Sequence, residues 1–158
     1  MTGSDSTGQI KVVATNRRAR RNYSIVDVFE AGLVLVGSEV KSLRDGKMEL
    51  KDSYGDIRSG EAWLVGAHIS PYDFAHEGGH EPERDRKLLL HRREIDRIAG
   101  QLAEKGLTLV PLQVYFKDGK AKIEVALAKG KTTFDKRQTL REREHKREME
   151  RAVRRPSS

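Results

Sequence analysis

Two strand-like segments joined by a tight turn constrain the fold of this chain most strongly. The segments are 107–116 and 121–128, and the turn between them contains Asp118-Gly119. An Asp-Gly pair between runs of branched apolar residues is a strong signal for a β-hairpin. In the second segment large apolar residues alternate with smaller or charged ones: Ile123, Val125 and Leu127. This pattern predicts an antiparallel sheet with one buried face.

Other segments predict further short strands and a few helices. Branched and aromatic residues bounded by turn residues predict strands at 10–14, 24–35, 53–58 and 61–69. Helices are predicted over 16–23, 38–44 and 91–105. Short strands with tight turns favour closure, because closure removes exposed edges. We therefore predict a mainly β fold with short helices: an antiparallel OB-like barrel with about six strands and three helices.

Single residues predict where these elements begin, bend and end. Asn16 and Ser38 are suited to cap the first two helices, and Gly106 is suited to end the third. Gly32 interrupts its apolar run and predicts a bend or bulge in that strand. Proline, glycine and mixed charges predict a long surface loop over 71–87.

The positive charge of the chain is concentrated at its C-terminal end. Residues 129–158 contain eleven Lys or Arg and five Asp or Glu, whereas residues 1–128 contain twenty and nineteen. Opposite charges in this tail are spaced for a helix, but such pairs stabilise a lone helix only weakly. We predict three parts: a disordered N-terminus at 1–9, the barrel at 10–128 and a basic tail at 129–158 that is disordered in isolation.

A second basic cluster lies near the start of the chain. It contains five cations with no acidic residue between them: Lys11, Arg17, Arg18, Arg20 and Arg21. Concentrated cations favour a polyanionic partner, because binding to phosphates releases condensed counterions. Solubility alone is the alternative explanation of this charge.

Cysteine usage and hydropathy exclude several classes of protein. The chain has no cysteine, which excludes disulfides, thiolate catalysis and Cys-ligated metal sites. No segment resembles a signal peptide or approaches the ~20 apolar residues of a membrane span. We expect a soluble cytoplasmic protein that does not enter a membrane.

One short pattern suggests a metalloprotease. His76-Glu77-Gly78-Gly79-His80 matches H-E-x-x-H, in which a helix places two histidines on one face to bind zinc. The two glycines between the histidines, with Pro71 and Pro82 nearby, argue against a helix. The plainer interpretation is a polar loop, and we expect no metal site.

Two further patterns suggest nucleotide chemistry or acid–base catalysis. Gly130-Lys131-Thr132 resembles the end of a phosphate-binding loop, but Val125 stands where that pattern requires glycine. Glu30 and Glu39 lie among apolar residues without a nucleophile at a defined spacing. We therefore expect no enzymatic activity. Glu30 beside a basic RNA face could accept hydrogen bonds from a base or orient an arginine.

Six segments together resemble the SsrA-binding protein (SmpB) family. The resemblance runs from about residue 10 to the C-terminus and is most specific at Glu39–Arg44 and at Lys129–Lys131 with Asp135–Arg137. The segments are Asn16-Arg17-Arg18-Ala19-Arg20 with Tyr23, Phe29-Glu30-Ala31-Gly32, Gly37-Ser38-Glu39-Val40-Lys41-Ser42-Leu43-Arg44, Asp52-Ser53-Tyr54, Arg86-Lys87-Leu88-Leu89-Leu90, and Ala128-Lys129-Gly130-Lys131 with Asp135-Lys136-Arg137.

The resemblance implies a function in the rescue of stalled bacterial ribosomes. It implies binding to the tRNA-like domain of transfer-messenger RNA (tmRNA) and its delivery for trans-translation. The tail would enter the empty mRNA channel beyond the decoding centre of the small subunit and become helical there. Elongation factor Tu would be an indirect partner through the charged RNA. We expect a monomer without a cofactor.

The resemblance and the basic clusters together predict the site residues. The expected RNA-binding residues are Asn16, Arg17, Arg18, Arg20, Arg21, Glu30, Leu89, Lys117 and Lys122. The expected decoding-centre and tail residues are Lys129, Gly130, Lys131, Phe134, Asp135, Lys136, Arg137, Arg141, Arg143, Lys146, Arg147 and Arg151. Phe134 stands where relatives are expected to carry His or Tyr, so it keeps an aromatic face but loses a hydrogen-bonding group.

The alternative function is a general OB-type RNA-binding or ribosome-associated protein. Such a protein is expected to spread stacking aromatics over one face of its sheet. Aromatic residues are only 6% of this chain, which weakens that alternative.

Overall fold

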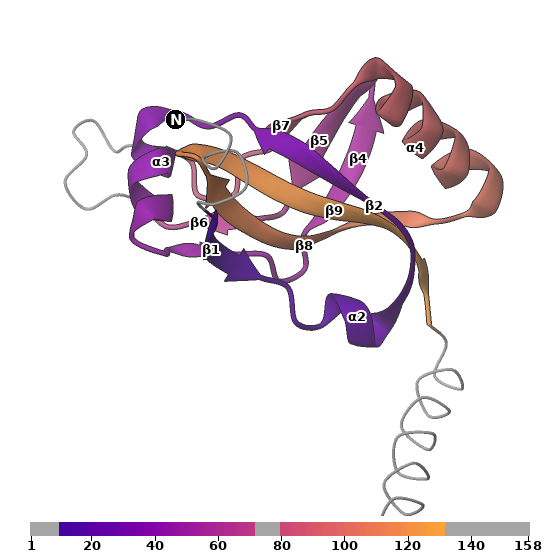
Figure 1. The fold of residues 1–158 in the computed structure, drawn as a ribbon, viewed down its shortest axis with the longest axis horizontal. Coiled ribbons are helices and arrows are strands. Elements are labelled where there is room, and N and C mark those ends of the chain that lie inside the picture. Colours follow the sequence, from indigo (N-terminus) through magenta and orange to yellow (C-terminus); the bar gives the residue numbers. More distant parts are fainter. Residues whose placement is uncertain (1–9, 72–79, 132–158) are drawn as a thin grey trace, which may run out of the picture.

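The computed structural model describes residues 10–71 and 80–131 (Figure 1). The strands are β1 (Ile10–Thr15), β2 (Tyr23–Leu33), β3 (Met48–Glu49), β4 (Tyr54–Arg58), β5 (Glu61–Val65), β6 (His68–Ile69), β7 (Arg86–Leu89), β8 (Thr108–Lys117) and β9 (Lys120–Gly130). The helices are α2 (Ala19–Asn22), α3 (Gly37–Arg44) and α4 (Arg92–Lys105). The predicted mainly β fold with three helices is confirmed.

The sheet is antiparallel, and six of its strands form a ring. Neighbouring strands follow the order β1-β8-β4-β5-β7-β2-β9, and β8 also pairs with β9. This last pairing joins β8, β4, β5, β7, β2 and β9 in a ring, with β1 added to the outside of β8. In Figure 1, α3 and α4 lie at opposite ends of this sheet. The predicted closure with about six strands therefore corresponds to the ring.

The hairpin predicted from Asp118-Gly119 is present. Lys117 pairs with Lys120, and both turn residues have positive φ, 52° and 82°. Positive φ at both central residues is the type I′ geometry that matches the twist of paired strands. The second strand of the hairpin continues to Gly130, two residues beyond its predicted end, because it pairs there with Tyr23 of β2.

Two apolar clusters lie on opposite faces of the hairpin. The larger cluster fills the ring and includes Ile123, Val125 and Leu127, which are at most 1% exposed. The alternation predicted for this strand is thus confirmed. The smaller cluster lies on the outer face and contains Ala126 and Ala128. The outer face therefore has a packing surface of its own, and the α2 segment covers it.

The predicted helix over 91–105 is also present. It spans Arg92–Lys105, with His91 at its N-cap and Gly106 in the left-handed region at its C-terminal end. No helix within residues 10–71 and 80–131 is long and apolar enough to cross a lipid bilayer.

Both predicted N-caps are wrong, because long-range hydrogen bonds take up those side chains. Arg18 holds the N-cap position of α2, and the Asn16 amide group instead donates to the Pro111 carbonyl at 2.9 Å. Val36 holds the N-cap position of α3, and the Ser38 hydroxyl lies 2.8 Å from His80 Nδ1. Capping preferences were outweighed by partners 95 and 42 residues away.

Three predicted strand and loop boundaries also differ from the structure. Strand β2 continues through Gly32, and its register shift lies between Ile25 and Asp27 instead. The segment predicted as one strand over 61–69 breaks at Gly66, whose φ is +81°. The predicted loop over 71–87 ends earlier, because Arg86 already pairs in β7.

Ring closure between β4 and β8 gives a first prediction. Gly55 pairs with Leu109, and a Cβ added at Gly55 would lie 2.6 Å from Leu109 Cγ. Leu109 is fully buried and has no room to withdraw. We expect Gly55→Ala to lower the free energy of unfolding by about 1–3 kcal/mol, the usual cost of overpacking. Urea unfolding followed by circular dichroism would measure this change.

The matched control is Gly100→Ala in α4. A Cβ at Gly100 would meet nothing within 4 Å, so alanine is expected to stabilise the helix by roughly 0.5–1 kcal/mol. Equal destabilisation by both substitutions would contradict the assignment of Gly55 to ring closure.

Candidate nucleic-acid interface

The basic segment, residues 16–23, is held on the outer face of the sheet by a buried alanine. Ala19 is only 2% exposed and belongs to the smaller apolar cluster with Val110, Leu112, Ala126 and Ala128. The four arginines of the segment are exposed around it: Arg17, Arg18, Arg20 and Arg21. One small apolar residue thus docks a segment that carries four exposed cations, two of them in α2 and two just before it.

Asn16 holds the first residue of the basic segment in place. Its backbone N–H donates to the Leu112 carbonyl at 2.8 Å, and its side-chain amide donates to the Pro111 carbonyl at 2.9 Å. These two bonds tie the start of the segment to β8. The backbone carbonyl of Asn16 also accepts from the Ala19 N–H at 3.3 Å, so Asn16 positions the arginines that follow it.

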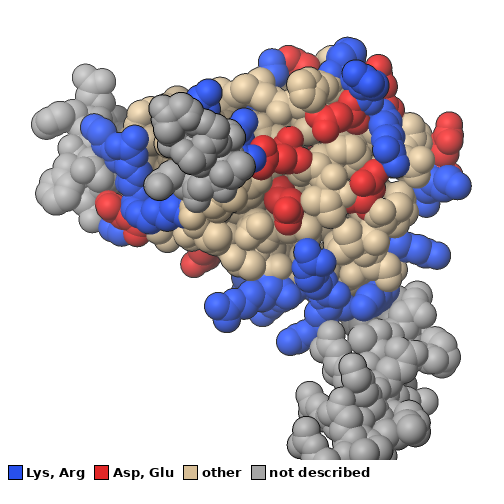
Figure 2. Space-filling model, viewed as in Figure 1, with Lys and Arg blue, Asp and Glu red and all other residues tan. Residues whose placement is uncertain are grey.

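The end of β9 lies beside the basic segment. Lys129 pairs with Ser24, and the backbone N–H of Lys131 donates to the Asn22 carbonyl at 2.8 Å. Figure 1 shows α2 near the point where β9 ends, and Figure 2 shows Lys and Arg side chains gathered over this edge of the molecule. The predicted RNA-binding arginines and the first predicted decoding-centre lysines therefore share one edge.

Glu30 lies on the outer face of β2 in a hydrogen-bonded cluster. The Tyr115 hydroxyl donates to its carboxylate, and Lys117 Nζ lies 3.5 Å from the same oxygen. The Tyr115 hydrogen bond, helped by the charges of Lys117 and Lys122, outweighs burial and lowers the pKa of Glu30. Burial and the bonded carboxylate raise the pKa of Tyr115 above its usual range, so the hydroxyl remains a donor.

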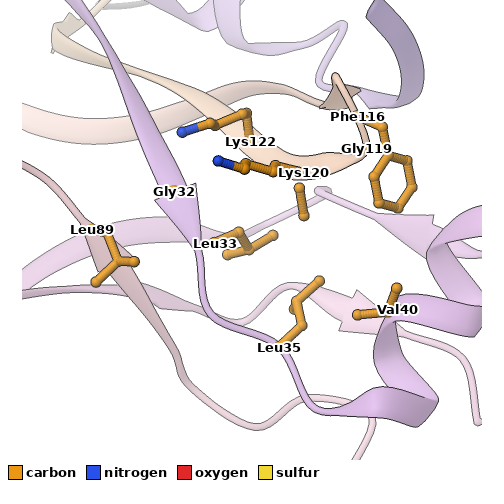
Figure 3. A pocket seen from close by; sticks show the side chains of 10 residues that line it. Gly32, Leu33, Leu35, Val40, Leu89, Phe116, Gly119, Lys120 and Lys122 are labelled. Atoms are coloured by element: carbon orange, nitrogen blue, oxygen red, sulfur yellow. The ribbon is translucent and has the colours of Figure 1, made fainter.

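Leu89 and Lys122 lie on either side of Gly32 at the other end of the sheet. Both pair with Gly32, and all three line a pocket of about 320 Å³ next to the hairpin turn (Figure 3). Leu89 is 55% exposed. In Figure 3, Lys120 and Lys122 extend in the same direction from β9. The structure therefore brings together two residues, Leu89 and Lys122, that are 33 positions apart in the sequence.

The predicted RNA-binding residues thus form two groups. One group is the basic segment at the edge where β9 ends, and the other surrounds the hairpin and includes Glu30, Leu89, Lys117 and Lys122. In Figure 2, acidic side chains lie on the face between basic ones. The Lys117 ammonium group lies 3.5 Å from the Glu30 carboxylate, whereas the Lys122 side chain makes no hydrogen bond or ion pair among the described residues.

Most of the predicted decoding-centre and tail residues lie outside the described residues. Only Lys129, Gly130 and Lys131 are described. The others are Phe134, Asp135, Lys136, Arg137, Arg141, Arg143, Lys146, Arg147 and Arg151.

The two motifs that suggested metal or nucleotide chemistry lie in surroundings that do not match those of a zinc site or a phosphate-binding loop. His76 lies outside the described residues, and both ring nitrogens of His80 are engaged, by Ser38 at 2.8 Å and by the Ile69 carbonyl at 2.9 Å. Within the described parts of the chain, no three His, Asp or Glu side chains group to hold a metal. The residues before Lys131, where a phosphate-binding loop would lie, belong instead to the antiparallel strand β9, which pairs with β2 as far as Gly130.

Glu39 is part of a buried ion-pair network, which the sequence did not reveal. Its carboxylate lies 2.6 Å from Arg86 Nη2 and 2.6 Å from Arg84 Nη2, and Glu39 and Arg86 are fully buried. Arg86 also donates to the Ala67 and Pro82 carbonyls. Burial raises the pKa of Glu39, but hydrogen bonds from Arg84, the Val36 N–H and Arg86 outweigh it, and the net shift is downward. This network is structural: it joins α3 to β7.

Two polar residues beside the basic segment were also missed. Gln113 and Glu124 line a hollow with Arg17 and Arg20. The sequence did place Glu124 on the outward side of its alternating strand. Its neighbours could not be predicted, because they depend on the register of β8, β9 and β1.

Known proteins are similar to this chain over most of its length. Residues 13–155 match the family model described as SmpB protein. The SsrA-binding protein of Sulfurihydrogenibium sp. (strain YO3AOP1) is 56% identical over 142 residues, which cover 90% of this chain and 93% of that protein. The SsrA-binding protein of Desulforudis audaxviator (strain MP104C) is 56% identical over 144 residues, covering 91% and 94%.

A solved structure resembles the fold as well. It is described as "tmRNA-SmpB: a journey to the center of the bacterial ribosome". Its chain is 44% identical with a TM-score of 0.64, and the match covers 80% of this chain and 93% of that chain.

Proposed function

This chain belongs to the SmpB family, and from that premise we propose that it binds the tRNA-like domain of tmRNA and delivers it to stalled ribosomes for trans-translation. The RNA would lie on the outer face of β2, β9 and β8, in contact with both groups of predicted residues. No catalytic step is part of this function.

The docked basic segment is the observation that carries the proposal. Four exposed arginines surround one buried alanine, and Asn16 holds the segment to β8. Arginine binds phosphate with a planar, bidentate geometry, and a docked segment loses less conformational entropy on binding than a free one. Structured RNA is recognised largely through its shape and its phosphates, which suits a fixed array of arginines.

The tail and the further partners also have roles in this function. Residues 132–158 would enter the empty mRNA channel of the small subunit, starting from Lys129 and Lys131 beside the basic segment. A tail guided into that channel from the same edge would link RNA binding to ribosome entry. Elongation factor Tu would take part through the charged RNA. The protein would act as a cytoplasmic monomer.

A competition experiment tests the function. Labelled tmRNA bound to the full chain would be challenged with excess tRNA and with an unrelated structured RNA at two salt concentrations. We expect the labelled RNA to be retained, with its preference surviving at the higher salt. Equal displacement by any RNA, with affinity collapsing as salt rises, would instead indicate a non-specific polyanion binder.

The arginines of the basic segment give a second prediction. We expect the double substitution Arg17→Ala, Arg20→Ala to weaken tmRNA binding and to lower the salt slope of log affinity by roughly 1 for each lost phosphate contact. The charge-matched control is Arg93→Ala, Lys105→Ala on α4, where both residues are exposed and lack ion pairs among the described residues. Equal effects of both pairs would mean that net charge alone determines binding.

A further inference from the structure

A small hollow lies between the basic segment and the outer face of β8 and β9. It is lined by Thr15, Asn16, Arg17, Arg20, Leu112, Gln113 and Glu124, and its volume is about 170 Å³. Pockets for drug-sized ligands begin at ~300 Å³, so this hollow has room for one flat ring system. Its lining combines cations, a carboxylate and an amide, which together suit a ligand with an anionic part and hydrogen-bond donors.

Strand register places the carboxylate of this hollow in a polar row across four strands. Thr15 pairs with Gln113, Gln113 with Glu124, and Glu124 with Glu30. Directly opposed like charges destabilise a sheet, so the Glu124–Glu30 pair is unfavourable for folding alone. Glu30 is compensated by Tyr115 and Lys117.

Glu124 and Gln113 have no such compensation. Neither side chain makes a hydrogen bond or an ion pair with another residue in the part of the chain that the structure describes, although Arg17 and Arg20 line the same hollow. A carboxylate on an RNA-facing surface also repels phosphates. Since Glu124 orients no arginine among the described residues, its use on such a surface is to accept hydrogen bonds from donors on the RNA.

Guanine has the base edge that matches these groups. A carboxylate can accept two parallel hydrogen bonds, and the Watson–Crick edge of guanine offers two adjacent donors, N1–H and the N2 amino group. The neighbouring O6 is an acceptor, which suits the amide N–H of Gln113 one strand away. Adenine and cytosine place a ring acceptor beside their amino group, so they would leave one carboxylate oxygen facing a lone pair. Unpaired bases expose this edge in RNA loops.

We propose that Glu124 and Gln113 read the Watson–Crick edge of one unpaired guanine of tmRNA, while Arg17 and Arg20 hold the phosphates beside it. This inference rests on the proposed function and adds a base-specific contact to it. The guanine is selected by the carboxylate, and the arginines bring the backbone into place without regard to sequence.

Inosine substitution in the RNA tests the proposal. The tRNA-like domain would be prepared with each unpaired guanosine in turn replaced by inosine, which lacks only the N2 amino group. Binding to the full chain and to Glu124→Ala would then be measured for each RNA. We expect one position at which inosine weakens wild-type binding about tenfold, as for the loss of one charge-assisted hydrogen bond, and has no further effect with Glu124→Ala.

Controls separate a lost base contact from a lost fold. Glu104→Ala removes an exposed carboxylate from α4, away from the hollow, whereas Glu124 is half-buried; Glu104→Ala is expected to bind all the RNAs as wild type does. Glu124→Ala is expected to melt no lower than wild type, because it relieves the repulsion with Glu30; Glu124→Gln, which keeps the side-chain size, serves if alanine disturbs the strand. Two outcomes would overturn the base contact alone: a loss of affinity in Glu124→Ala that is the same for every RNA, or an inosine effect that persists in Glu124→Ala.

Failure of the wild-type chain to prefer tmRNA over tRNA would overturn the proposed function and this inference with it.

Discussion

A chain that ends at Lys131 is expected to keep most of its affinity for tmRNA and to lose rescue of stalled ribosomes completely. The described ring, the basic segment and the hairpin group all remain in this truncation. Residues 132–158 carry much of the net positive charge, so some affinity loss is expected at low salt, where non-specific phosphate contacts contribute most. Binding would be measured with labelled tmRNA, and rescue with ribosomes stalled on a message without a stop codon.

The place of the truncation matters, because the end of β9 supports the basic segment. Gly130 pairs with Tyr23, and the Lys131 N–H donates to the carbonyl of Asn22, the last residue of α2. A chain that ends at Ala128 loses both contacts. We therefore expect this shorter chain to bind tmRNA more weakly than the chain that ends at Lys131. If the longer truncated chain lost specific binding as well, the tail would belong to the RNA-binding surface and the division between ring and tail would be wrong.

Local sequence patterns were sufficient to predict the elements that are stabilised by residues close together in the sequence. Asp118-Gly119 requires two positive φ angles and pairs the strands on either side of it, so the hairpin could be predicted without knowledge of the rest of the chain. Helix α4 is local in the same sense: its buried residues Ile95 and Ile98 are three positions apart, and Gly106 ends it. Strand β7 was missed because two of its four residues, Arg86 and Lys87, are charged, and because its pairing partners Trp63 and Leu33 are distant in sequence.

The candidate site could be predicted only in part for the same reason. The arginine cluster is visible in the sequence, but its docking through Ala19 depends on an apolar patch formed by β8 and β9. Asn16 has a side chain suited to cap a helix, but in the structure its amide group donates to the Pro111 carbonyl instead. The polar row through Glu124 exists only once the register of four strands is fixed.

Glu39→Gln is expected to destabilise the fold by about 3–5 kcal/mol, the usual cost of leaving a buried charge without its partner. Glutamine keeps the size of the side chain but leaves the fully buried Arg86 without its counterion. The matched control is Glu61→Gln, which removes a half-exposed ion pair with Lys87 and should cost at most about 1 kcal/mol. Urea unfolding at neutral pH would measure both changes.

The same substitution should alter how stability depends on pH. The folded-state pKa of Glu39 is lowered from its ordinary value of 4.5, so its charged form contributes stability above that value, and this contribution is lost as pH falls through the folded pKa. The wild-type chain should therefore lose stability below about pH 4.5 more steeply than Glu39→Gln, which has no carboxylate to protonate. If the two acid limbs ran parallel, or if Glu39→Gln cost no more than Glu61→Gln, the network would not hold α3 to β7 in the way that its geometry indicates.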